Sequence, residues 1–333
     1  MRFPLSLTTS LAGYIIKNKV SGRKRFPLVL MLEPLHKCNL SCTGCGRIRE
    51  YRSTISSVLP VEQCLAAVDE CGAPVVSICG GEPLIYRDIG ALCSGILARK
   101  KHIYLCTNGV FLEKSLGKFR PSSRFFFNVH LDGLEQTHDL CVERKGVFQE
   151  AVNGIKAAKA AGFIVCTNTT VYQQTDMREV EALFEFLVPL GVDGFILSPA
   201  YEYDALGETG IFLTRRQIHE KFRDVGRLFR KYRLFNSPIY LDFLQGKHED
   251  MPCTAWGNPT YNPQGWKAPC YLITDAHHPT FAEFIEKTPW ERHGKGNDPR
   301  CENCMMHSGY EASAALGVNA SFRDMLKQIA AQF

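Results

Sequence analysis

The sequence contains no long apolar run. A transmembrane helix needs roughly 18 consecutive apolar residues, and no stretch of the sequence reaches that length. Its start, Met1-Arg2-Phe3-Pro4, lacks the apolar core and the small-residue cleavage site of a secretory signal. A dense basic stripe with interleaved aromatic residues is also missing, and the net charge is only +5, so no nucleic-acid partner is predicted. These absences favour a protein of a reducing cytoplasm, where thiols stay free or bind metals.

Cysteine, in contrast, is plentiful, with 14 in 333 residues. Cys38, Cys42 and Cys45 form a C-x3-C-x2-C pattern on a loop that follows an apolar run. Three thiolates this close can hold three irons of a 4Fe–4S cluster and leave the fourth iron open. A C-x2-C pair alone is also found in zinc sites and redox pairs, but the additional cysteine favours the cluster.

A second motif, Gly80-Gly81-Glu82-Pro83, follows the apolar run 74–79. Together with the cysteine loop it resembles the radical S-adenosylmethionine (radical SAM) superfamily. The resemblance implies that backbone groups of residues 80–83 bind the methionyl amine of S-adenosylmethionine beside the open iron. Gly44 departs from the pattern, because many members carry an aromatic residue there that packs on the adenine.

The order of the expected elements alternates strand and helix, which predicts a parallel α/β sheet with right-handed crossovers. Six such units are too few for a closed eightfold barrel, so we expect an open, partial (β/α)6 barrel of the radical SAM type. The expected strands cover residues 28–33, 74–79, 102–106, 124–131, 163–171 and 194–197, and the expected helices cover 61–71, 87–99, 146–161, 177–190 and 214–232. Phe125-Phe126-Phe127 is interpreted as buried strand rather than as a lipid pocket.

Further polar residues are expected at the carboxyl ends of these strands, where active sites of parallel sheets lie. The resemblance implies cofactor contacts for Thr107-Asn108-Gly109, His130 and Asp132, with His130 in place of the usual serine. A simple turn is the alternative for Asp132-Gly133. Cys106 directly precedes Thr107, so we hypothesise that its thiol quenches a product radical; a packing role is the alternative.

The segment 247–310 is rich in Pro, Gly, Asn and His and shows little periodicity. Four cysteines would explain how a long loop is held, and they resemble a reduced form of the auxiliary-cluster domain behind many radical SAM cores: Cys253, Cys270, Cys301 and Cys304. Four thiolates would saturate a second 4Fe–4S cluster or a zinc ion. We therefore divide the chain into a lead segment 1–27, a radical SAM core 28–235 and a loop-rich C-terminal extension 236–333.

The resemblance narrows further to the radical SAM proteins of hopanoid biosynthesis. It is carried by five segments: Met1–Leu5, Glu33–Leu40, Cys79–Leu84, Leu105–Gly109 and Trp256–Tyr261. It implies that the 5′-deoxyadenosyl radical adds to the alkene of a hopene, diploptene, and gives adenosylhopane, with an electron donor such as flavodoxin or ferredoxin. Two alternatives stay open: another radical SAM enzyme that abstracts hydrogen from a peptide or small molecule, and a non-catalytic metal protein.

The stretch 5–24 mixes apolar residues with lysine and arginine. It could lie on an anionic membrane surface and guide a lipid inward, which would make the protein peripheral to the membrane. A plain helix packed on the barrel is the alternative interpretation.

Overall fold

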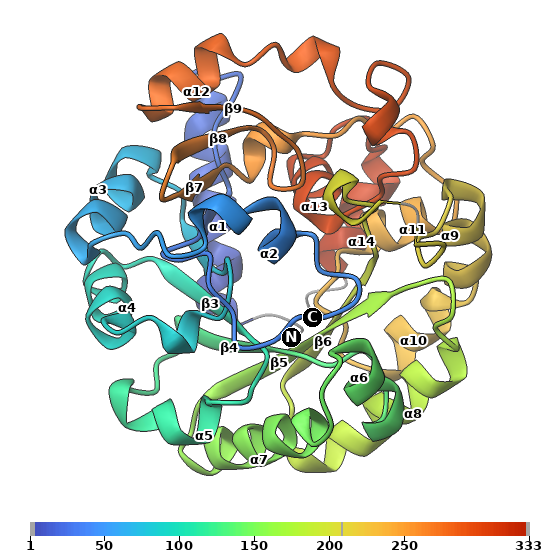
Figure 1. Cartoon of the computed structure of the whole chain (residues 1–333). Helices are drawn as coiled ribbons and strands as arrows, with labels where there is room; N and C mark the ends of the chain where they lie inside the picture. Colours follow the sequence, from blue (N-terminus) through green and yellow to red (C-terminus); the bar gives the residue numbers. More distant parts are fainter. Residues whose placement is uncertain (1–3, 208, 331–333) are drawn as a thin grey trace.

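A computed structural model describes residues 4–207 and 209–330, so residues 1–3 of the opening segment lie outside it. A curved nine-stranded sheet in the order β6-β5-β4-β3-β2-β1-β7-β8-β9 forms the centre of the molecule (Figure 1). The strands are β1 (Val29–Leu32), β2 (Val75–Ile78), β3 (His102–Thr107), β4 (Phe125–His130), β5 (Ile164–Val171), β6 (Gly194–Pro199), β7 (Thr260–Asn262), β8 (Gly265–Pro269) and β9 (Thr274–His278).

Strands β1 to β6 pair in parallel with their sequence neighbours, and helices lie on the outside of this part of the sheet (Figure 1). The sheet is open, since its strand order ends at β6 and β9. The predicted partial barrel is therefore confirmed. The first helices are α1 (Leu5–Val20), α2 (Arg47–Glu50), α3 (Val61–Cys71), α4 (Ile89–Ala98), α5 (Leu112–Ser115), α6 (Glu135–Cys141), α7 (Val147–Ala160) and α8 (Met177–Leu187).

The strands alternate between two apolar environments, because successive side chains of a strand point to opposite faces. Val76, Ile103 and Phe127 belong to the large core between the sheet and the outer helices. Phe126 belongs to a separate cluster on the inner face of the sheet, together with Leu7 of α1. The interpretation of residues 125–127 as a buried strand is thus correct, since all three side chains are buried. They do not share one environment, however, because Phe126 faces the barrel interior.

Two predicted helices end earlier than expected. The range 214–232 is two helices, α9 (Arg215–Phe222) and α10 (Val225–Lys231), because Asp224 leaves helical geometry and begins the second one. Aspartate favours such positions, where its side chain competes with the backbone. Helix α8 stops at Leu187 and a short 3-10 turn follows, because Pro189 cannot donate the hydrogen bond that a longer α-helix needs.

The C-terminal extension contains more regular structure than its sequence indicates. Strand β7 pairs in parallel with β1, and β7, β8 and β9 continue the sheet in antiparallel fashion. These strands are three to five residues long, too short for a clear periodic signal. The remaining helices are α11 (Pro238–Leu244), α12 (Phe281–Lys287), α13 (His307–Leu316) and α14 (Phe322–Ala330).

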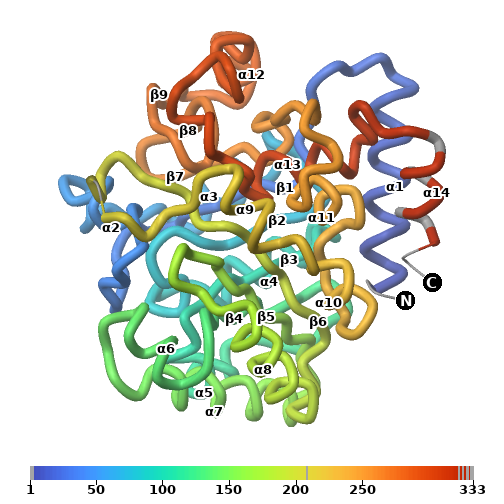
Figure 2. The backbone as a smooth tube through the Cα atoms, turned by 90° about the vertical axis from the view of Figure 1, so that its right-hand side faces the viewer, coloured from blue at the N-terminus to red at the C-terminus, as the bar shows by residue number. Residues whose placement is uncertain are grey.

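Helix α1 covers the amino-terminal end of the barrel. Its Leu7 and Leu11 pack against Val75, Phe126 and Ile164, which lie near the starts of their strands. Figure 2 shows α1 on the side of the molecule opposite α2. Among the described residues, no helix is both long enough and apolar enough to cross a membrane.

Candidate functional site

The cysteine loop 33–46 lies at the carboxyl end of β1, beside the corresponding ends of β2, β3 and β4. Arg49 of α2 donates hydrogen bonds to the carbonyls of Cys42 and Cys45, at 3.1 and 2.7 Å, and the Leu40 amide donates to the Cys38 sulfur at 3.4 Å. Backbone and side-chain hydrogen bonds therefore fix the three cysteines on one loop.

Burial raises the pKa of the Cys38 thiol to about 11. Burial also raises the pKa of Cys42, and the neighbouring thiols Cys45 and Cys38 raise it further. Thiols with raised pKa values stay protonated near neutral pH. A bound metal ion displaces these protons, because thiolates are the form that ligates a metal. The donor set, three thiols that influence one another in a desolvated place, fits an iron–sulfur cluster.

Two glycines of the loop leave room for tyrosines. A Cβ on Gly44 would lie only 2.5 Å from Cε1 of Tyr172, which follows β5, and a Cβ on Gly46 would lie 2.7 Å from Cδ1 of Tyr203, which follows β6. Because residue 44 is a glycine and not the aromatic residue that many members carry there, Tyr172 can occupy the space beside the loop. Sequence reasoning missed both tyrosines, although an aromatic residue just past the carboxyl end of a strand was a usable signal.

The Gly80-Gly81 pair brings its segment against the cysteine loop itself. Gly80 has a φ of +105°, and a Cβ on it would lie 2.5 Å from the Leu35 carbonyl oxygen. The Gly81 amide donates to that same oxygen at 3.1 Å, and the Glu82 amide donates to the Lys37 carbonyl at 3.0 Å. Only glycine permits this approach, so the pair positions the cysteine loop.

Glu82 is buried and connects two of the predicted segments. Its carboxylate accepts hydrogen bonds from the Thr107 hydroxyl at 2.7 Å and from the Asn108 amide at 2.8 Å. Burial raises the pKa of Glu82 to about 7, although these hydrogen bonds oppose the shift. Glu82 and Thr107 are therefore held against each other, while the Asn108 side chain reaches the cysteine loop and donates to Asn39 at 2.8 Å. Gly109 keeps a positive φ next to Ala151.

His130 and Asp132 form a pair at the end of β4, with 2.8 Å between Nε2 and Oδ2. Burial alone would lower the pKa of His130, but the Asp132 carboxylate outweighs it and the pKa rises. Asp132 also accepts from the Thr170 amide at 2.8 Å, and its own amide donates to His138. The structure thus places Asp132 in a network beyond a simple turn.

Cys106 lies on the inner face of β3. Its sulfur is 3.4 Å from the Ser77 hydroxyl and 3.5 Å from the side-chain nitrogen Nδ2 of Asn128, which donates to it. Burial raises the pKa of Cys106, so the group is a neutral thiol near pH 7. Two residues closer to the strand's start, Tyr104 stacks on Phe126 with 4.7 Å between ring centroids. The inner face is therefore polar near the site and apolar toward α1.

The four C-terminal cysteines line one cavity of about 110 Å³. Gly309 of α13 leaves space for the Cys253 sulfur, and the Leu272 amide donates to the Cys270 sulfur at 3.4 Å. Burial raises the pKa of Cys301 to about 11 and that of Cys304 to about 12. Within the described residues, no three His, Cys, Asp or Glu side chains converge so that one metal ion could be held.

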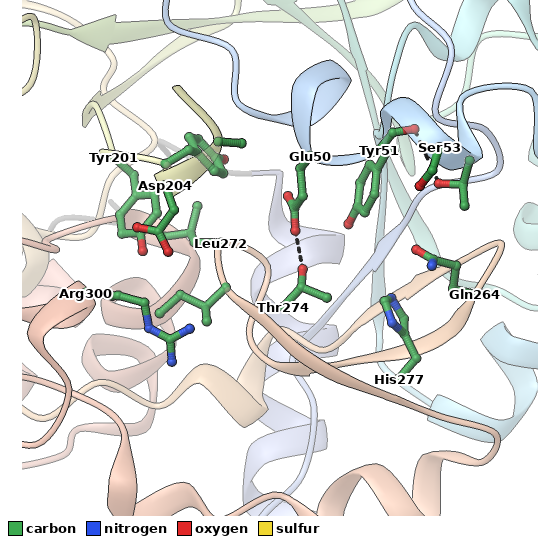
Figure 3. A pocket seen from close by; sticks show the side chains of 14 residues that line it. Glu50, Tyr51, Ser53, Tyr201, Asp204, Gln264, Leu272, Thr274, His277 and Arg300 are labelled. Carbon is green, nitrogen blue, oxygen red and sulfur yellow. Dashed lines mark hydrogen bonds between the residues drawn. The ribbon is translucent and has the colours of Figure 1, made fainter. Parts of the chain in front are cut away.

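A larger, polar pocket of about 400 Å³ lies between α2, the loop after β6 and the β8–β9 hairpin (Figure 3). Glu50, Asp204, His277 and Arg300 line it, and Figure 3 shows Glu50 pointing toward Thr274. No sequence motif indicated this pocket, because its lining comes from four separate segments. Beneath it, the fully buried Lys267 contacts Glu50 at 3.1 Å, and buried Arg47 is paired with Glu33.

Among the buried polar atoms that have no hydrogen-bond partner are Nδ2 of Asn39, on the cysteine loop, and Oδ1 of Asn168, on β5. A buried polar atom without a partner is costly, so each is available to a polar ligand. S-adenosylmethionine carries amine, carboxylate and ribose groups that could satisfy such atoms. The site thus fits both the cluster and the cofactor.

Comparison with known proteins agrees with this geometry. The model of the radical SAM superfamily matches residues 32–187, and a family described as a domain of unknown function, DUF3463, matches residues 195–328. Residues 32–187 form a radical SAM domain. The superfamily uses a 4Fe–4S cluster and S-adenosylmethionine, so the two predicted cofactors are confirmed.

Among curated relatives, Fe-coproporphyrin III synthase of Methanosarcina barkeri is 26% identical over 48% of this chain and 40% of its own length. GTP 3′,8-cyclase of Petrotoga mobilis is 31% identical over 53% of this chain and 55% of its own length. The chain thus spans about half of these two relatives or less. GTP 3′,8-cyclase of Campylobacter fetus is 23% identical over 80% of this chain and 92% of its own length.

Solved structures show the same fold. Streptococcus suis SuiB bound to precursor peptide SuiA has a TM-score of 0.62 at 16% identity and covers 89% of this chain and 74% of that one. Native anSMEcpe with bound AdoMet and Cp18Cys peptide has a TM-score of 0.56 at 16% identity, and the match covers 92% of this chain and 99% of that one. These names refer to a nucleotide, a porphyrin and peptides, and none refers to a hopene.

Proposed function

We propose that this radical SAM enzyme adds a 5′-deoxyadenosyl group to the alkene of a hopene and forms a carbon–carbon bond. The observation that carries the proposal is the division of the barrel interior. Tyr104, Phe126, Ile164 and Leu7 make its amino-terminal half apolar, and the Cys106 thiol lies between that half and the cysteine loop. A flat apolar lipid suits such an interior, because its burial is favourable at roughly 25 cal/mol per Å².

In this proposal Cys38, Cys42 and Cys45 hold the 4Fe–4S cluster. The backbone of residues 80–83, with Asn108, His130 and Asp132, binds S-adenosylmethionine, and the unpartnered atoms of Asn39 and Asn168 extend that set. When bound, the reduced cluster and the cofactor supply the 5′-deoxyadenosyl radical, and the protein positions and shields it.

The role proposed for Cys106 follows from its protonated state. Addition to the alkene leaves a radical on the lipid, and the neutral Cys106 thiol can give it a hydrogen atom, so that an S–H bond breaks and a C–H bond forms. The thiyl group then needs one electron and one proton. A flavodoxin or ferredoxin, the class of donor expected from the sequence, can supply the electron.

For the second cysteine set we propose a 4Fe–4S cluster in preference to zinc. Among the described residues, Cys253, Cys270, Cys301 and Cys304 line one cavity instead of meeting at one point. A cluster needs thiolates around a volume, whereas zinc needs four at about 2.3 Å from one centre. The division into segments 1–27, 28–235 and 236–333 also stays a proposal.

A second candidate is hydrogen abstraction from a peptide or a small polar molecule. The relatives and structures named above support this candidate better than the lipid. The polar pocket beside α2 also favours it, because Glu50, Asp204 and Arg300 could bind charged groups of such a substrate (Figure 3).

The test uses anaerobically reconstituted, reduced protein with S-adenosylmethionine and either diploptene or its saturated analogue. Mass spectrometry would follow 5′-deoxyadenosine and the adenosyl adduct. The proposal expects an adduct with diploptene and none with the saturated analogue. Cofactor cleavage that diploptene leaves unchanged, with a peptide or nucleotide consumed instead, would favour the second candidate.

A further inference from the structure

Helix α1 has an inner face that is packed along its whole length. Leu7 is buried against the barrel interior, while Tyr14 and Ile15 pack with Phe26 in a second cluster that includes Leu316 of α13. Lys19 adds a hydrogen bond from its ammonium group to the Leu316 carbonyl at 2.8 Å. These contacts hold the helix in one orientation, so its opposite face is fixed as well.

The opposite face carries an exposed apolar line. Leu5, Ile16 and Val20 are 54%, 62% and 84% exposed, and Thr9 and Ala12 continue the line between them at helical spacing. Among the described residues, these three side chains belong to a set of only eight large apolar side chains with this degree of exposure. We call the line from Leu5 to Val20 the outer stripe.

Positive charge gathers at the carboxyl end of the outer stripe. Lys17, Lys19, Arg23, Lys24 and Arg25 fall within nine residues, and no acidic residue occurs before Glu33. All five residues are exposed to solvent. Arg25 also lies over the Trp290 ring, 5.9 Å from the ring centroid, so this contact holds the end of the basic turn.

We propose that the outer stripe and the basic turn dock the protein onto an anionic lipid bilayer. Charge complementarity selects this occupant, because a polybasic segment next to apolar side chains is attracted to acidic headgroups while the apolar side chains enter the interface. A helix that lies in the interface needs no membrane-spanning length. The 16 residues of α1 suit this arrangement.

The docking orientation would place the apolar end of the barrel toward the lipid that carries the proposed substrate, and in this respect the inference rests on the proposed function. Leu7 and Leu11 lie on the bilayer-distal face of α1, directly below the apolar half of the barrel. Figure 2 shows α1 on the side opposite α2 and the cysteine loop. In this orientation the apolar half of the barrel, which Leu7 and Leu11 close, lies nearer the bilayer than the Cys106 thiol does.

The experiment measures co-sedimentation of the reconstituted full chain with vesicles of equal parts phosphatidylglycerol and phosphatidylcholine, and with vesicles of phosphatidylcholine alone. We expect binding to the anionic vesicles that high salt weakens. The double variant Lys17→Gln/Lys24→Gln should bind about 25-fold more weakly at low salt, at roughly fivefold per charge. Ile16→Ser/Val20→Ser should bind about tenfold more weakly.

The matched control is Leu140→Ser/Val188→Ser, which removes two apolar side chains, 76% and 50% exposed, away from α1. It should bind the vesicles like the parent, and circular dichroism should show that all variants are folded. Equal vesicle binding by parent and α1 variants would overturn the inference. So would a dimer of the parent without lipid that Ile16→Ser/Val20→Ser dissociates, since a second copy would then cover the stripe.

Failure of this inference can be told apart from failure of the proposed function. If docking is correct but the substrate is not a hopene, vesicle binding still falls in the α1 variants and no adduct forms. If the reaction is correct but docking is wrong, parent and variants convert diploptene held in vesicles at the same rate. If both are correct, the variants lose activity on vesicle-held diploptene and keep it on diploptene in detergent.

Discussion

Gly81 offers a sharp test of how the site is built, because its position leaves no space for a side chain. A Cβ on Gly81 would overlap the Lys37 carbonyl and lie 2.7 Å from the His36 carbonyl oxygen. Ordinary contact begins near 3.4 Å, so in Gly81→Ala the strand end and the cysteine loop must separate by at least about 0.7 Å. The move strains the hydrogen bonds from Gly81 to Leu35 and from Glu82 to Lys37.

The expected cost combines two terms. Forcing a methyl group into a packed place costs about 1–3 kcal/mol, and leaving a buried backbone group unpaired costs about 1–3 kcal/mol. A loss of roughly 2–6 kcal/mol follows, with Cys38 displaced together with the loop. We therefore expect Gly81→Ala to retain much less iron and sulfide per chain after reconstitution and to melt at a lower temperature.

Gly117→Ala is the matched control, because no heavy atom lies within 4 Å of a Cβ placed there. Iron and sulfide analysis, visible absorption and thermal melting would be compared for parent and both variants under anaerobic conditions. If Gly81→Ala held iron like Gly117→Ala and melted at the same temperature, the close approach of the two segments would be wrong.

Three further predictions concern the same site. Gly44→Phe should lose cluster loading because its ring overlaps Tyr172, and adding Tyr172→Ala should restore the iron content; no restoration would contradict the overlap. Cys106→Ala loses weak hydrogen bonds worth about 1 kcal/mol, so it should fold, still release 5′-deoxyadenosine and change the yield or stereochemistry of the adduct; an unchanged product would exclude the quenching role. Because burial raises the pKa of Glu82 from 4.5 to about 7, the folded state binds its proton more tightly, and stability should fall by about 3 kcal/mol as pH rises through that window. Glu82→Gln should flatten this pH dependence in denaturant melts, and an equal slope in parent and variant would argue against the raised pKa.

Much of the core architecture could be predicted from the sequence, for physical reasons that differ between elements. Strand β4 is a nearly continuous apolar run because both of its faces are covered, and this made it easy to recognise. The cysteine loop was equally clear, because its spacing has few alternative chemistries. The break at Asp224 was missed, since the apolar periodicity continues across it while one residue leaves helical geometry.

The side chains that surround the cysteine loop could not be predicted, because residues far apart in the sequence come together there only in the folded chain. Tyr172 and Tyr203 follow different strands, and only the fold brings them against Gly44 and Gly46. The polar pocket has the same origin, since Glu50 and Arg300 are far apart in the sequence. Strands β7 to β9 were hidden by their shortness, and they show that the second cysteine set is attached to the barrel sheet through β1.

The central claim is that an adenosyl radical adds to an apolar alkene, and one measurement tests it most directly. Reduced, reconstituted protein would receive diploptene and S-adenosylmethionine labelled with carbon-13 throughout the ribose, and the lipid extract would be analysed by mass spectrometry. The account predicts a hopane-sized product that carries the complete labelled adenosyl group. Labelled 5′-deoxyadenosine in full yield, with no label in the lipid, would contradict it.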